Sequence, residues 1–154
     1  PDVEVQFAFI ESWFDPPKAI ESATAQIAAG ADFIYSQPIG PIEACMDAGV
    51  WCAGNYVDQN DLGPEVVLTS NLILWEPHWN TIIDAWWDHV ANGVPYDAPT
   101  EAVMFRLAEG GTDIVVIDDK DGAIPAEVID QVMAIRQQMI DGSLVVEFNP
   151  DMTE

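Results

Sequence analysis

Helical periodicity recurs four times along the chain, and each time it ends directly before a glycine. The helical stretches are residues 16–29, 41–48, 75–92 and 125–141, and the glycines are Gly30, Gly49, Gly93 and Gly142. Glycine ends helices readily because it adopts the left-handed conformation without a steric penalty. A short apolar run usually follows, which is the rhythm of repeated β-α units. The pattern therefore predicts an α/β fold with a mostly parallel sheet flanked by helices.

The apolar runs are the expected strands of this sheet. They cover residues 3–10, 32–36, 50–54, 66–70, 102–107, 114–117 and 145–148. In the first run, valines and phenylalanines alternate with smaller or polar residues, which predicts a buried strand near the middle of the sheet. Asp15 then stands as the N-cap of the first helix. A chain of 154 residues has the length of one ordinary domain, so residues 1–154 are predicted to form a single α/β domain.

Polar and aromatic side chains gather in the loops that follow the first four strands, where a parallel sheet collects its functional residues. The candidate ligand-binding residues are Trp13, Phe14, Gln37, Asn55, Tyr56, Asp58 and Asn71. Rings stack on flat ligands, while amides and carboxylates hold hydroxyl groups. We therefore expect a small neutral ligand, either polyhydroxyl or heterocyclic. A phosphate-bearing ligand is disfavoured, because these loops carry no arginine or lysine and the sequence has no phosphate-binding glycine motif.

Several of these residues also have a purely structural interpretation. Trp13 is either a stacking platform for a ligand or a lid on the core. Asn55 and Tyr56 are also ordinary turn residues. Asp58 is equally suited to holding the amides of its own loop.

The chain is strongly acidic, with 27 acidic and 4 basic residues and a net charge of −23. Such a surface repels nucleic acid and anionic membranes, so neither is an expected partner. A saline source is a hypothesis, since salt screens the self-repulsion of an acidic surface. Cys45 and Cys52 lie in apolar company and are expected to be buried thiols, with a disulfide as the alternative. No run of 18 apolar residues occurs, so no membrane span is predicted.

Catalytic and metal-binding patterns are absent from the sequence. His78 and His89 lie too far apart along one helix to share a metal ion. Asp118, Asp119 and Asp121 miss the spacing of a calcium loop. The loop serines have no histidine placed to activate them and no nucleophile elbow. We predict a protein that is not an enzyme and has no catalytic residues, no metal and no cofactor.

Four motifs together resemble the basic membrane protein family. They are S-W-F-D-P-P-K at residues 12–18, A-T-A-Q-I-A-A-G-A-D-F-I at 23–34, G-N-Y-V-D-Q at 54–59 and V-L-T-S at 67–70. The family consists of substrate-binding proteins of ABC transporters with a type I periplasmic-binding fold, and several members bind purine nucleosides. The resemblance covers nearly the whole chain but corresponds to the second half of a typical member. It implies one lobe of a two-lobed receptor, from a chain that begins in mid-protein.

The resemblance also implies partners and a location. A transporter permease would be the protein partner, and the full-length parent would be a periplasmic or extracellular protein anchored as a lipoprotein. Two positions depart from the family pattern. Tyr56 stands where nucleoside-binding members usually have a ribose-holding aspartate, and Ile73 stands where a lysine is usual. The resemblance therefore supports the scaffold more strongly than a purine nucleoside ligand.

Two functions follow from these patterns. The first is a solute-binding component of an ABC-type uptake system, with its ligand in a cleft between two lobes. The second is a sensory or regulatory module that dimerises through its tryptophan-rich helix. That helix, residues 72–93 with its approach, would pack either against a missing first lobe or against a second copy. The residues concerned are Trp75, Trp79, Trp86 and Trp87.

Overall fold

The computed structural model describes residues 3–98, 100, 103–115 and 119–146 of the chain. Its contacts divide the chain into two compact units. The first unit comprises residues 1–72 and 114–121, and the second comprises residues 73–113 and 122–154. The described strands form one sheet in the order β1-β2-β3-β4.

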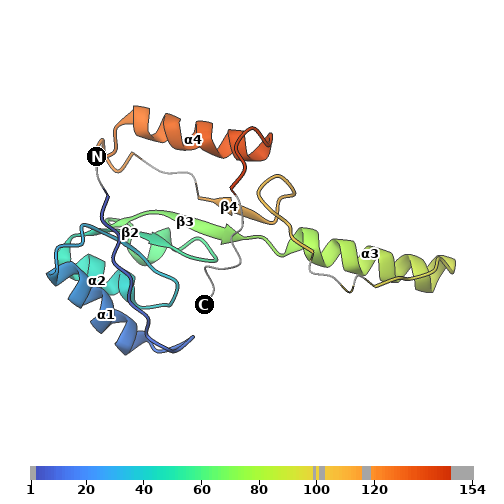
Figure 1. Cartoon of the computed structure of the whole chain (residues 1–154), viewed down its shortest axis with the longest axis horizontal. Coiled ribbons are helices and arrows are strands. Elements are labelled where there is room, and N and C mark those ends of the chain that lie inside the picture. The colour runs from blue at the N-terminus through green and yellow to red at the C-terminus, as the bar shows by residue number, and fades with distance from the viewer. Residues whose placement is uncertain (1–2, 99, 101–102, 116–118, 147–154) are drawn as a thin grey trace. The chain divides into compact units, whose positions relative to one another are not determined.

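The first unit alternates strands and helices as predicted. Its elements are α1 (Pro16–Ala28), β1 (Phe33–Tyr35), α2 (Pro41–Ala48), β2 (Trp51–Gly54), a short 3-10 helix η1 (Asn60–Leu62) and most of β3 (Val67–Ile73). β1 pairs with β2 in parallel, and β2 pairs with β3 in parallel. The helices α1 and α2 lie side by side (Figure 1). The α/β prediction is confirmed.

The core of this unit forms where β2 meets its neighbours. Cys52 lies in register with Ile34 of β1 on one side and Val67 of β3 on the other, and all three side chains are buried. Cys45 of α2 packs into the same cluster and is fully buried. The two cysteines are free thiols, as the sequence predicts. Burial raises the pKa of Cys45 and raises the pKa of Cys52 to about 12.

The first helix begins where its capping residue predicts. The Asp15 carboxylate accepts a hydrogen bond from the backbone N–H of Lys18 at 3.2 Å, which satisfies one of the unpaired donors of the first turn. Two prolines open the helix, where a missing N–H costs nothing. The helix therefore starts at a fixed point directly after the Trp13–Phe14 loop.

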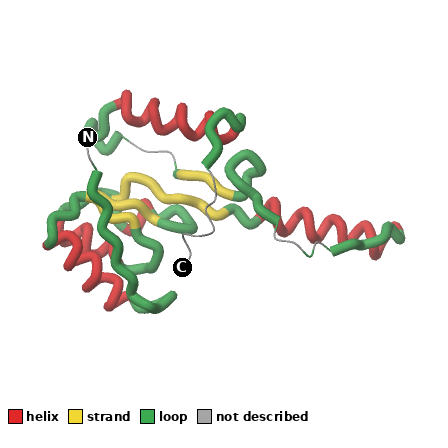
Figure 2. The backbone as a smooth tube through the Cα atoms, in the orientation of Figure 1, coloured by secondary structure: helices red, strands yellow, loops and turns green. Residues whose placement is uncertain are grey.

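The buried strand predicted over residues 3–10 is wrong. These residues form no strand, and Figure 2 draws them as loop. Val3, Val5, Phe7 and Phe9 are all exposed. A strand is buried only when neighbouring strands and helices cover it, and in the described part of the chain no strand pairs with this segment. One contact is a side-chain hydrogen bond, donated by Gln26 to the carbonyl of Gln6 at 3.2 Å.

The second unit contains two long helices. They are α3 (Glu76–Asn92) and α4 (Ala126–Ile140), and the unit also holds most of β4 (Thr112–Ile114). Neither helix has a buried residue. Arg136 of α4 makes a two-pronged ion pair with Asp113, with nitrogen–oxygen distances of 2.7 and 2.6 Å. This pair ties α4 to β4.

Two strands predicted late in the chain are absent from those of their residues that the structure describes. Residues 103–107 form no strand, and neither do residues 145–146. Residues 102, 116–117 and 147–148 lie outside the described residues. β4 begins two residues before the run predicted at 114–117. Within the described ranges, no helix has both the length and the apolar character needed to cross a membrane.

The buried thiol of Cys52 makes the free energy of unfolding depend on pH in the alkaline range. Its pKa is raised from about 9 to about 12 on folding, so the unfolded chain releases this proton first as the pH rises. Stability from this group is fully present below about pH 9 and is lost between pH 9 and pH 12. We expect the free energy of unfolding in urea to fall by about 1 kcal/mol more from pH 8 to pH 10 in the wild type than in Cys52→Ala. Equal slopes in the two proteins would contradict this.

Candidate functional site

The candidate site lies at the carboxyl ends of the parallel strands in the first unit. Tyr35 is the last residue of β1, and Gln37 follows it in the next loop. Asn55 and Tyr56 directly follow β2. Asn71, predicted in the loop after β3, instead lies within that strand, because β3 continues to Ile73.

Hydrogen bonds join these five residues into what we call the amide–phenol cluster. The hydroxyl of Tyr35 donates to the side-chain oxygen of Asn71 at 3.1 Å and approaches that of Asn55 at 3.4 Å. The amide of Gln37 donates to the hydroxyl of Tyr56 at 3.5 Å. The amide of Asn55 donates to the carbonyl of Gln37 at 3.4 Å. The cluster thus spans three adjacent strands.

Asn55 is the anchor of the cluster because it is only 4% exposed. Its backbone N–H donates to the side-chain oxygen of Gln59 at 3.2 Å, and the N–H of Gln59 donates to Ser70 at 3.0 Å. Gly54, the residue before it, allows this close approach. A Cβ at Gly54 would stand 2.5 Å from the Ser70 hydroxyl and 2.8 Å from Gln59. The β2–η1 loop is therefore fixed against β3.

The two phenols of the cluster remain partly exposed. Tyr35 is 61% exposed and Tyr56 is 43% exposed. Desolvation, followed by the effect of the nearby Tyr56, raises the pKa of Tyr35. Tyr56 has a φ of 69°, a left-handed conformation that is unfavourable for a bulky residue. The cluster therefore offers neutral hydrogen-bonding groups.

The remaining sequence-predicted residues are not joined to the cluster. The carboxylate of Asp58 accepts a hydrogen bond from the N–H of Asn60 at 2.9 Å, a contact within its own loop. Trp13 is 88% exposed and Phe14 is also exposed, so the interpretation of Trp13 as a lid on the core is wrong. The N–H of Phe14 donates to Ser12 at 3.3 Å. Roles for Asp58, Trp13 and Phe14 in binding remain predictions.

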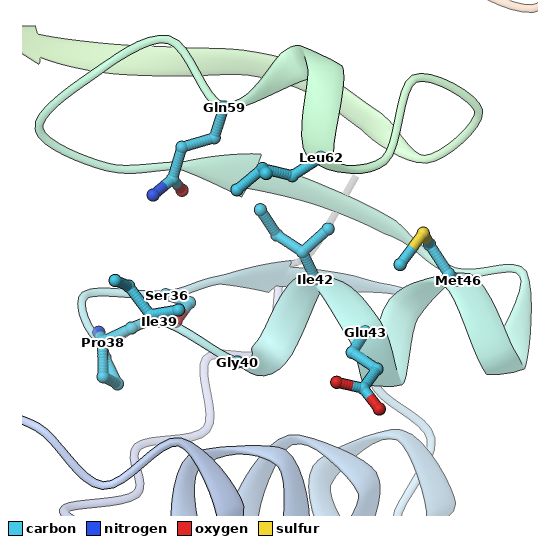
Figure 3. A pocket seen from close by; sticks show the side chains of 9 residues that line it. All are labelled: Ser36, Pro38, Ile39, Gly40, Ile42, Glu43, Met46, Gln59 and Leu62. Atoms are coloured by element: carbon cyan, nitrogen blue, oxygen red, sulfur yellow. Dashed lines mark hydrogen bonds between the residues drawn. The ribbon is translucent and has the colours of Figure 1, made fainter.

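A pocket of about 160 Å³ lies beside the cluster, between the β1–α2 loop, the first turns of α2 and η1 (Figure 3). Its lining is mainly apolar. Ser36 and Gln59 also line it, and both belong to loops that carry cluster residues. Sequence reasoning did not find this pocket.

Tyr35 is the cluster member that sequence reasoning missed. The signal was present, because Phe33 and Tyr35 flank the buried Ile34 in a strand of three residues. Alternation places the tyrosine on the exposed side of β1, next to the loops that carry the predicted residues. Ser70 is also more than a loop residue, since its hydroxyl fixes the β2–η1 loop.

Metal binding finds no support among the residues that the structure describes, where no group of three histidine, cysteine or acidic side chains could hold an ion. Asp119 and Asp121 belong to those residues, while Asp118 does not.

No family model matches the chain. Among curated proteins, it is 27% identical over 158 residues to a Haloferax volcanii protein named as an ABC transporter glucose-binding protein, covering 95% of this chain and 35% of that protein. It is 29% identical over 93 residues to a purine-binding protein of Brucella abortus, covering 56% and 27%. It is 32% identical over 76 residues to the transcriptional activator protein med of Bacillus subtilis, covering 47% and 24%.

Solved structures share the fold. A transcriptional activator of the comK gene from Bacillus halodurans has a TM-score of 0.69 and 20% identity, covering 90% of this chain and 47% of that one. A solute-binding protein of an ABC transporter system from Aeropyrum pernix has a TM-score of 0.56 and 17% identity, covering 89% and 46%. The chain thus has an α/β fold found in solute-binding proteins. It spans about a third or less of its curated relatives and less than half of each solved chain.

The burial of Asn55 gives a prediction about stability. In Asn55→Ala, the Gln37 carbonyl and the Tyr35 hydroxyl lose a partner at a buried position, so we expect the free energy of unfolding to fall by about 2 kcal/mol. The matched variant Asn71→Ala removes one hydrogen bond at a more open position and should cost no more than about 1 kcal/mol. Urea denaturation measures both. Equal losses would show that Asn55 does not anchor the cluster.

Proposed function

We propose that the chain is a ligand-binding lobe of the solute-binding component of an ABC-type uptake system. The ligand would be small and neutral, either polyhydroxyl or nucleoside-like, and bound in a cleft between two lobes. The observation that carries this proposal is the amide–phenol cluster, which gathers neutral donors and acceptors at the carboxyl ends of three parallel strands. In open α/β sheets this edge is where ligands bind.

The chemistry of the cluster supports an uncharged ligand. Its five side chains are two phenols and three amides, and the raised pKa of Tyr35 keeps that phenol protonated. The chain carries a net charge of −23, which opposes the approach of phosphate groups. One relative is named as a glucose-binding protein and another as a purine-binding protein, and both names favour a small uncharged ligand, either a polyhydroxyl compound or a heterocycle. Trp13 and Phe14, whose rings are exposed, would stack on the ligand.

The proposal includes a second lobe and a membrane partner. We infer that the parent is a two-lobed receptor similar to basic membrane proteins, because the chain spans 46% of a solved solute-binding protein. The exposed tryptophans of α3 would pack against the other lobe. Closure of two lobes over the ligand would report occupancy to the permease. Such a receptor would work outside the cell or in the periplasm, anchored as a lipoprotein.

Calorimetric titration of the chain tests the ligand class. The panel consists of D-glucose, myo-inositol and adenosine, each paired with a phosphorylated counterpart. We expect at least one neutral compound to bind, and its phosphorylated counterpart to bind at least about tenfold more weakly because the cluster has no cation to pair with phosphate. Equal or tighter binding of the phosphorylated compounds would refute the neutral site.

Removal of one hydroxyl then locates the site. Tyr35→Phe keeps the ring and removes the donor, so the affinity for the bound compound should fall about three- to tenfold. The matched control is Tyr96→Phe, the same change outside the cluster. An unchanged affinity in Tyr35→Phe would place the ligand elsewhere.

A regulatory module is the second candidate function. The likeness to two transcriptional activators favours it, one of them the solved structure with a TM-score of 0.69. The exposed face of α3 would then be a dimer interface. The aromatic residues concerned are Trp79, Trp86 and Trp87 of α3 and Trp75 directly before it, all about half exposed or more. Exposed apolar side chains gathered on one segment mark interaction surfaces more often than singly scattered ones do.

Sedimentation of the chain separates the two functions. The regulatory module predicts a discrete dimer at micromolar concentration, strengthened by salt because both copies are acidic. A Trp79→Gln, Trp86→Gln double variant should then be monomeric, whereas the control Trp13→Gln should still dimerise. A monomer at both low and high salt would exclude this function.

A further inference from the structure

We propose that the pocket beside the amide–phenol cluster receives an apolar substituent carried by the ligand. The ligand is then a neutral polyhydroxyl compound with an attached apolar group of a few carbon atoms. This inference rests on the proposed function, because the cluster would hold the hydroxyl-bearing part. It adds a second subsite with a different chemistry.

The first support is the continuity of the two sites. Ser36, which lines the pocket, stands between Tyr35 and Gln37 in the chain. Gln59 lines the pocket and also accepts the hydrogen bond from the N–H of Asn55. The same two loops therefore border both sites. A molecule bound on the cluster would have the pocket within reach of a short substituent.

The second support is the chemistry of the lining. Leu62 reaches in from η1, while Ile42 and Met46 reach from α2 on the opposite side (Figure 3). Ile39 and Leu62 line the pocket, and both are 57% exposed. An apolar group bound in the pocket would cover them. The carboxylate of Glu43 points away from Gln59 and Leu62 in the same view. The interior is therefore suited to an uncharged apolar group.

The shape of the pocket is fixed by the backbone around it. Gly40, at the start of α2, has a φ of 129°, which a residue with a side chain rarely adopts. A Cβ there would stand 2.9 Å from the carbonyl oxygen of Pro16 and 3.1 Å from Ile20. The Ser36 hydroxyl donates to the carbonyl of Pro38 at 2.8 Å and closes the same loop. The pocket wall is thus held in place without a ligand.

Two homologous series of probes test the inference. They are the methyl, ethyl, propyl and butyl β-D-glucopyranosides and the N6-methyl to N6-butyl adenosines. Within the series that binds, each methylene that enters the pocket should tighten binding about fourfold until the pocket is full. Calorimetry of the unmodified chain gives the dissociation constants.

Paired leucine variants locate the effect. Leu62→Asn keeps the size of an exposed side chain and makes the pocket polar, so it should flatten the rise along the series while the methyl compound binds as before. Leu144→Asn is the same change outside the pocket and should leave the rise intact. Circular dichroism confirms that both variants are folded.

The outcomes distinguish a failure of the apolar subsite from a failure of the proposed function. If the methyl compound binds and affinity does not rise along the series, the subsite is wrong and the proposed function stands. A rise that persists in Leu62→Asn also overturns the subsite. If no member of either series binds, the proposed function falls and the subsite falls with it.

Discussion

The packing of Cys52 between two neighbouring strands is the contact on which the first unit depends. Cys52 stands in register with Ile34 and Val67, and Cys45 of α2 closes over the same point. Cys52 and Ala53 point to opposite faces of β2 and both are buried, so small apolar side chains suit this strand. This contact fixes the register of β1, β2 and β3 relative to one another. The loops at their carboxyl ends therefore emerge at one edge of the sheet.

The amide–phenol cluster is a consequence of that alignment. Each strand contributes one or two groups, and no two strands could supply the set alone. Gly54 and the Ser70 hydroxyl then fix the β2–η1 loop, which also forms one wall of the pocket. The β2–η1 loop thus contributes both to the polar amide–phenol cluster and to the wall of the apolar pocket. The absence of charge in the cluster separates this site from the phosphate sites common at helix N-termini.

Periodicity and capping predicted the four helices well, while contacts between distant residues were beyond the sequence. The bounds of α2 were predicted to the residue, and Asp15 caps α1 as expected. The strand at residues 3–10 failed because alternation says which faces are apolar but not whether another strand covers them. Gln37, Asn55 and Tyr56 were expected to lie together because residues after parallel strands share an edge, and Asn71 lies with them although it is inside β3. Tyr35 was missed although the alternation of β1 carries its signal, and the pocket was missed because it depends on how side chains pack.

The uncovered segment near the start of the chain has a consequence for handling the protein. Residues 3–9 read V-E-V-Q-F-A-F, with no proline and a single charge, and their apolar side chains face solvent. Runs of this kind add readily to one another as strands, which is the first step of aggregation. Each copy has a net charge of −23 at pH 7, and the repulsion between copies opposes that association. The net charge approaches zero close to the sequence isoelectric point of about 4.1, so we expect the chain to be least soluble in mild acid.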